Sequence, residues 1–203
     1  DAVRFIAGDS RLRVVFVVFA LVGTFAFNYQ VSLLKLADVG FHDRRMFGIL
    51  LSATGVGSLV GSLLTAARDE VTTTWFFGNG LLLGVSGLSL AWAPTVWLAV
   101  LLAVPAGIGG AAFIAGQNAI IQQEAPPDMR GRLLALGAVA FLGSTPIGAP
   151  VTGWIADNVG AEWSLGYGST ITLVVVTVGV LARRRAERTA PTAVEAEEPV
   201  AAQ

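Results

Sequence analysis

The sequence predicts an all-α integral membrane protein with six transmembrane helices, and three observations carry this prediction. Of the 203 residues, 54% are hydrophobic and only 13% are charged, against about 25% charged in soluble globular domains. So few ionised groups do not cover the exterior of a water-soluble core of this size. The apolar residues also form five long runs without charge. Each run is continuously apolar rather than alternating, which favours helices over a β-barrel.

The lengths of these runs give the number of crossings. Residues 14–34 and 46–67 form runs of 21 and 22 residues, and each is long enough to cross a hydrocarbon core of about 30 Å once. The run over 71–123 has 53 residues, enough for two crossings, and Ala93-Pro94-Thr95 interrupts it near the middle. Runs of 24 and 20 residues follow. We therefore predict helices over 14–36, 47–67, 75–93, 96–121, 133–156 and 163–182.

Small residues and prolines predict how two of these helices pack. Gly57 and Gly61 form a GxxxG pattern in the second helix, which allows a neighbouring helix to approach closely. The fifth helix contains two prolines and several glycines, which disfavour a straight course and predict a bend. The residues concerned are Pro146, Gly148, Pro150 and Gly153.

Lysines and arginines predict the orientation of the chain. With the amino end inside, ten of them lie on the cytoplasmic side and three on the outer side, and such a bias sets topology. We expect both termini in the cytoplasm and a multi-pass protein of the bacterial plasma membrane. Residues 1–13 are then a cytoplasmic lead-in, 14–185 the six-helix bundle, and 186–203 a disordered tail rich in Ala, Pro, Thr and Glu.

Several function classes lose support from the composition. The chain has no cysteine and one histidine, His42, so thiolate chemistry and imidazole metal clusters are absent from it. Its helices contain no pair of carboxylates and no nucleophile beside a base. The net charge of −1 argues against general nucleic-acid binding. We expect no enzyme activity, no catalytic residues, no metal site and no cofactor.

Polar residues inside the helices are the candidate ligand contacts, because buried amides in lipid are costly unless they face protein or a watery cavity. Thr24, Asn28 and Tyr29 belong to the densest polar cluster within any helix. Gln117 and Asn118 end a stripe of small residues on the fourth helix. For these two amides, lining a cavity and simple interhelical hydrogen bonding stay equal alternatives.

Charged residues in the two cytoplasmic loops are candidates for gating ion pairs. The loop from Glu124 to Arg132 is short and charged, and the loop after the second helix begins at Arg68. Ionic contacts between the loops would tether the helix ends, while the alternative is that these charges only set topology. The candidates are Arg68, Asp69, Glu124, Arg130 and Arg132.

In its second helix (47–63), in the loop 127–132 and in the segment 148–160, the sequence resembles the carboxy-terminal half of a major facilitator superfamily transporter. It is most similar to the drug and siderophore exporter branch that includes the enterobactin exporter. The resemblance implies half of a twelve-helix fold, built as a 3+3 inverted repeat. It also implies the bilayer, a small-molecule substrate, protons and a missing amino-terminal six-helix half as partners.

From this resemblance we expect the carboxy-terminal half of a secondary active transporter that exports small amphipathic molecules by proton antiport with alternating access. The first, second, fourth and fifth helices would line the cavity, and the third and sixth would face lipid. Two alternatives stay open. One is a nutrient symporter of the same fold, and the other is a six-helix structural or assembly protein without transport activity.

Overall fold

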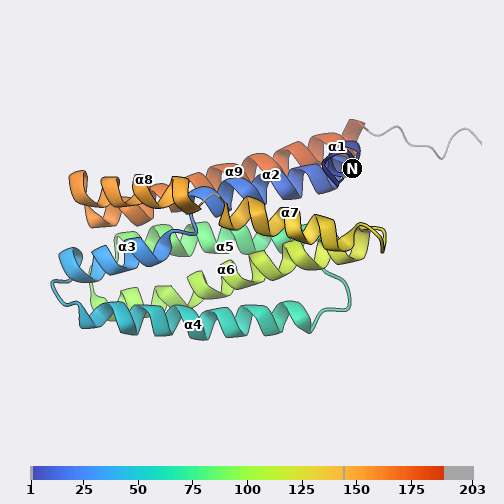
Figure 1. Ribbon diagram of the computed structural model, residues 1–203. Helices are drawn as coiled ribbons and strands as arrows, with labels where there is room; N and C mark the ends of the chain where they lie inside the picture. Colours follow the sequence, from blue (N-terminus) through green and yellow to red (C-terminus); the bar gives the residue numbers. More distant parts are fainter. Residues whose placement is uncertain (1, 144, 190–203) are drawn as a thin grey trace, which may run out of the picture.

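A computed structural model describes residues 2–143 and 145–189, and every element in this part of the chain is helical. The long helices lie side by side along a common axis (Figure 1). In chain order the elements are α1 (Ala2–Gly8), α2 (Ser10–Phe25), α3 (Tyr29–Lys35), the π-helical turn η1 (Leu36–Gly40), α4 (Arg45–Ala66), α5 (Thr73–Ala91), α6 (Val96–Glu124), α7 (Arg130–Leu142), α8 (Thr145–Asn158) and α9 (Ala161–Thr189).

Within the described ranges, five helical segments are long and apolar enough to cross a bilayer. They are Ser10–Gly40, Arg45–Ala66, Thr73–Ala91, Val96–Glu124 and Ala161–Arg185, with lengths of 31, 22, 19, 29 and 25 residues. About 20 apolar residues are needed for one crossing. The prediction of a multi-pass α-helical membrane protein is therefore confirmed.

Two of the six expected helices are divided, so the prediction of exactly six spans is not confirmed. The helix expected over 14–36 stops at Phe25 and restarts at Tyr29. The helix expected over 133–156 consists of α7 and α8, of 13 and 14 residues, which lie end to end (Figure 1). Neither reaches the length of one crossing by itself.

The second break lies at the amino-terminal edge of the stretch where a bend was expected. α7 ends at Leu142, and the glycines and prolines of that stretch begin at Gly143. Pro146 lies in the first turn of α8, where a missing N–H leaves no helical hydrogen bond unmade. Pro150 lies inside α8 without ending it.

Capping side chains explain where the intact helices begin. The hydroxyl of Thr72 accepts a hydrogen bond from the Trp75 backbone N–H at 3.2 Å, and that of Thr95 accepts one from the Leu98 N–H at 3.4 Å. Each satisfies a backbone donor that the first helical turn leaves unpaired. Thr95 is the last residue of the turn expected between the third and fourth helices, and this turn joins α5 and α6.

The closest helix pair is α4 with α6. Gly57 packs on the backbone of Val104, and Gly61 packs on the backbone of Ile108. Gly107 of α6 packs in turn on the carbonyl of Thr54. A Cβ atom at any of the three glycines would overlap the facing backbone, so glycine is required there.

Both ends of the described chain, at α1 and at the end of α9, lie at the same end of the bundle (Figure 1). The loops α4–α5 and α6–α7 lie there too. The opposite end carries four exposed tryptophans, Trp92, Trp97, Trp154 and Trp163, and tryptophan prefers the interface between membrane and water. α9 continues to Thr189, past residue 185 where the bundle was expected to end, and residues 190–203 of the expected tail lie outside the described residues.

Candidate functional site

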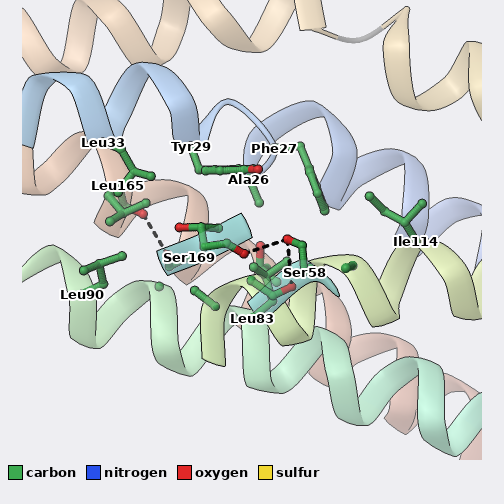
Figure 2. Close-up of a pocket in the computed structure, with 17 residues that line it drawn as sticks. Ala26, Phe27, Tyr29, Leu33, Ser58, Leu83, Leu90, Ile114, Leu165 and Ser169 are labelled. Carbon is green, nitrogen blue, oxygen red and sulfur yellow. Dashed lines mark hydrogen bonds between the residues drawn. The ribbon is translucent and has the colours of Figure 1, made fainter. Parts of the chain in front are cut away.

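The candidate site is a pocket of about 250 Å³ inside the bundle, beside the break between α2 and α3. Its walls come from that break and from α3, α4, α5, α6 and α9. Figure 2 shows Phe27, Tyr29 and Leu33 on one side and Leu83 and Leu90 on the other. The volume is close to the lower limit of ligand pockets, about 300 Å³. It suits a small molecule or one ring system of a larger molecule.

Hydroxyl groups form the polar part of the pocket. Ser58 donates to the Thr54 carbonyl at 2.9 Å, Ser169 donates to the Leu165 carbonyl at 2.9 Å, and Thr172 donates to the Gly168 carbonyl at 2.8 Å. Figure 2 shows Ser58 and Ser169 between the apolar walls. Each hydroxyl has a carbonyl acceptor on its own helix, Ser58 also reaches the Gly107 carbonyl of α6 at 3.5 Å, and each oxygen keeps lone pairs that can accept a hydrogen bond from a ligand.

Small residues on α5 and α6 keep the pocket open. A Cβ atom at Gly87 would meet the Ser169 hydroxyl oxygen at 2.5 Å, so a larger residue there would displace a polar group of the pocket. At Gly110 the nearest atoms, from Leu83 and Phe27, would be 3.7 and 3.8 Å away, which is ordinary van der Waals contact. A Cβ atom at Gly110 would therefore fit in the pocket wall without overlap.

The pocket has an apolar and uncharged lining. Lys, Arg, Asp, Glu and His are absent from the described residues that form its wall. An ionised ligand group would lose its hydration there without gaining a partner charge. This lining favours a neutral ligand, or the neutral part of an amphipathic one.

Of the five predicted ligand contacts, Tyr29 lines the pocket, and Thr24 and Asn28 form the helix break beside it. The Thr24 hydroxyl donates to the Ala20 carbonyl at 2.8 Å, and Asn28 Nδ2 donates to the Thr24 carbonyl at 3.0 Å. Gly148 of α8 packs directly on that carbonyl and on the Asn28 amide. Asn28 thus satisfies a carbonyl at the end of α2 and, with Gly148, brings α8 close to the break.

Gln117 and Asn118 lie away from the pocket on α6. Gln117 is 1% exposed, and neither its Nε2 nor its Oε1 has a hydrogen-bond partner. Its amide faces α7, where a Cβ atom at Gly137 would lie 2.7 Å from Nε2. Asn118 is half-buried. The structure therefore separates these two amides from Tyr29.

The five predicted gating residues do not pair with one another among the residues that the structure describes. Glu124 forms an ion pair with Arg11 of α2 at 2.8 Å. The Arg68 guanidinium stacks on the Trp75 ring, 3.6 Å from its centroid, and Arg130 Nε donates to the Ala125 carbonyl at 3.0 Å. The other two, Asp69 and Arg132, are exposed. Their gating role stays a prediction.

An ion pair that the sequence did not predict joins the carboxy-terminal ends of the two divided helices, α2–α3 and α7–α8. Lys35, the last residue of α3, pairs with Asp157 near the end of α8. The two residues are 122 positions apart in the sequence, so no local pattern could have indicated the pair. It connects the two half-helices that follow the two breaks.

Sequence reasoning also missed most of the pocket lining. Ser58 was not among the predicted ligand contacts, and α9, the sixth expected helix, was expected to face lipid. The signal on α9 was its run of small residues, which includes Gly166, Gly168 and Ser169. In the structure α5 and α9, the third and sixth expected spans, both line the pocket, and α7 and α8 are not among its described walls.

Membrane-crossing helices with discontinuous segments beside an interior pocket are the usual architecture of a secondary transporter. The family model described as Major Facilitator Superfamily matches residues 12–202. The chain belongs to the major facilitator superfamily, a family of membrane transporters.

Two curated relatives carry the name Multidrug resistance protein B homolog, from Mycobacterium tuberculosis strains CDC 1551 / Oshkosh and ATCC 25618 / H37Rv. Each is 32% identical to this chain over 117 residues, which cover 52% of this chain and 22% of the relative. The aligned part is thus a small share of those relatives. No solved structure gives a significant match.

Proposed function

We propose that this chain forms the carboxy-terminal helical half of an exporter of small amphipathic molecules. The observation that carries the proposal is the interior pocket, whose lining is apolar, uncharged and fringed with hydroxyl groups. The similarity to proteins named for multidrug resistance agrees with export of such molecules. The sequence resemblance adds siderophores as a second class of cargo, and the transport test below includes them.

The pocket chemistry narrows the substrate. Apolar walls bury a hydrocarbon or aromatic body, and the oxygens of Ser58 and Ser169 accept hydrogen bonds from a few donor groups. Tyr29 would contact the substrate directly, because it lines the pocket. It follows Asn28, whose amide donates to the Thr24 carbonyl, so these two residues would act on the substrate through the helix break. Gln117 and Asn118 would act on the α6–α7 side of the bundle, when α7 moves.

Coupling to protons requires a titratable group on the transport path. Asp, Glu and His, the groups that exchange protons near neutral pH, are absent from the described residues of the pocket wall, so in this proposal the coupling acid belongs to the amino-terminal half. The two halves would rock around the site, as in other transporters built from repeats. The ion pair of Glu124 with Arg11 and the loop charges Arg68, Asp69, Arg130 and Arg132 would break and re-form at the cytoplasmic end during this motion.

The direct test measures transport by the full-length protein in vesicles. We expect an imposed pH gradient to drive efflux of a neutral hydrophobic dye, with drugs and siderophores compared in the same assay. Efflux without any dependence on the gradient would contradict proton coupling, and uptake in place of efflux would support the symporter alternative.

A variant pair connects transport with the pocket. Gly110→Leu adds a large side chain at a residue that lines the pocket, whereas Gly116→Ala adds a methyl group elsewhere on α6, with its nearest atoms 3.8 Å away. We expect Gly110→Leu to lower dye efflux at least tenfold at unchanged expression and Gly116→Ala to retain it. Equal efflux from both variants would remove the pocket from the transport path.

A further inference from the structure

Two hollows flank α5 at the arginine-bearing end of the bundle, and neither shares a residue with the interior pocket. One has a volume of about 290 Å³ and lies between α5 and α9. The other, of about 450 Å³, lies between α5 and the loop that follows α4. Thr74 and Gly78 line both hollows. The two hollows therefore meet across one face of α5.

Three arginines line these hollows. Arg68 lines the hollow beside the first turn of α5, and its stacking on the Trp75 ring holds it there. Trp75 is fixed in turn, because its indole Nε1 donates to the Thr65 hydroxyl at 3.2 Å. These contacts hold the guanidinium group at the wall of the hollow and restrict its rotamers.

The other two arginines belong to α9. Arg183 and Arg184 line the hollow between α5 and α9, and Arg183 donates a hydrogen bond to the Thr73 hydroxyl. No carboxylate is among the described residues that form either hollow. Asp69 and Glu70 follow Arg68 in the loop but line neither one. The hollows thus concentrate positive charge.

The hollow between α5 and α9 continues into an apolar wall. Phe77 and Leu81 of α5 and Val180 of α9 form this wall. Farther along the same helices, Val85 and Val178 are exposed, as side chains that face lipid are. A ligand that fits has a negative charge at one end and a hydrocarbon chain at the other.

We propose that these two hollows bind an anionic phospholipid. Its phosphate would lie beside Arg183 and Arg184, with Arg68 on the other side of Thr74, and one acyl chain would follow Leu81 and Val180. Basic pockets between helices at a membrane surface bind phosphate headgroups by this combination of charge and apolar contact. The inference concerns the lipid-facing side of α5 and α9, and it does not depend on the direction or coupling of transport.

Gly78→Leu is the most specific test, because a Cβ atom at Gly78 would have no neighbour within 4 Å. The Cβ of the introduced leucine has open space, and its side chain occupies the place where the hollows meet. Gly48→Leu is the matched control, since Gly48 also has no neighbour within 4 Å and lies on α4. Arg184→Gln removes one charge from the site, and Arg4→Gln removes the same charge from an exposed position on α1.

The measurement is native mass spectrometry of the full-length protein in detergent, with equal amounts of phosphatidylglycerol and phosphatidylethanolamine. We expect the wild-type protein to retain phosphatidylglycerol preferentially, and Arg184→Gln to lower its affinity about fivefold. Gly78→Leu should abolish the preference, and both controls should keep it. Inorganic phosphate at the same concentration should not compete, because it lacks the acyl chain.

Equal retention of the two lipids by the wild-type protein would overturn the proposal. Wild-type retention of phosphatidylglycerol by Gly78→Leu would overturn it as well. The readout is bound lipid, so a failure here leaves the transport proposal untouched, and a failure of dye efflux leaves this site untouched.

Discussion

The α4–α6 pair and the pair of divided helices, α2–α3 beside α7–α8, use glycine in opposite settings. α4 and α6 are continuous, and Gly57, Gly61 and Gly107 let the two backbones touch along several turns. In the divided pair, Gly148 packs on a carbonyl that lies at a helix break. The first pair forms a fixed wall of the pocket. The second pair is interrupted, and discontinuous helices beside an interior pocket are typical of the binding sites of secondary transporters.

This difference shows that glycine and proline do not by themselves mark where a membrane helix stops. Pro105 lies inside α6, and this helix is unbroken over its 29 residues. The break between α2 and α3 falls at Ala26-Phe27-Asn28, which contains neither glycine nor proline. At this break the side-chain amide of Asn28 donates a hydrogen bond to the Thr24 carbonyl at the end of α2. Neighbouring helices decide whether a local weakness becomes a break.

The largest effect is expected for Gly57→Ala in the continuous pair. The added methyl group would overlap the Val104 carbonyl, and the backbone of α6 cannot move aside as a side chain can. We expect a loss of about 3 kcal/mol in the free energy of unfolding, the upper part of the usual range for overpacking. Reversible unfolding of the full-length transporter in mixed micelles measures it.

Gly55→Ala is the matched control on the same helix, since a Cβ atom there has no neighbour within 4 Å. We expect it to stabilise α4 by about 0.5–1 kcal/mol, because alanine restricts the unfolded chain. If both variants had the same stability, α4 and α6 would not be in backbone contact.

A smaller loss of stability is expected for Gly148→Ala in the divided pair. Its methyl group would overlap the Thr24 carbonyl and the Asn28 amide, but a helix end can shift more readily than a continuous helix. We expect a loss of about 1–2 kcal/mol together with slower dye efflux. Gly153→Ala on the same helix, where a Cβ atom has open space, should stabilise α8 by about 0.5–1 kcal/mol, as Gly55→Ala does for α4, and leave dye efflux unchanged.

Gln117→Leu should increase stability by about 1 kcal/mol, because a buried amide without partners carries its full desolvation cost. The comparison is Asn79→Leu on α5, where Nδ2 donates to the Trp75 carbonyl at 2.8 Å and the change should destabilise. Thermal unfolding in detergent measures both variants. A lower unfolding temperature for Gln117→Leu would indicate that this amide is hydrogen-bonded in solution.

The smallest effect is expected at the ion pair between Lys35 and Asp157. Their side chains are 33% and 59% exposed, and exposed ion pairs contribute about 0–1 kcal/mol. A double-mutant cycle with Lys35→Gln and Asp157→Asn should give a coupling free energy of about 0.5 kcal/mol. A coupling several times larger would show that the half-helices α3 and α8 depend on this pair for their position.

The parts of the site predicted from the sequence are those that a single helix reveals. Tyr29 was recognised because polar residues cluster around it in one apolar run. Ser169 and Thr172 were missed, because their role depends on α9 facing α4 and α6 across the pocket. Gln117 was recognised as a buried amide, but its separation from Tyr29 depends on how α6 turns toward α7.

The sequence by itself determined that the chain resides in lipid, roughly where its apolar segments begin and end, and which family it resembles. These properties follow from local composition and length, since charge and hydrophobicity act on each segment separately. Only the tertiary structure decided where two of the helices break, which hydroxyls meet in one pocket and which arginines meet across α5. These features arise where helices distant in sequence face each other, and the residue pattern of one helix does not specify which helix packs against it.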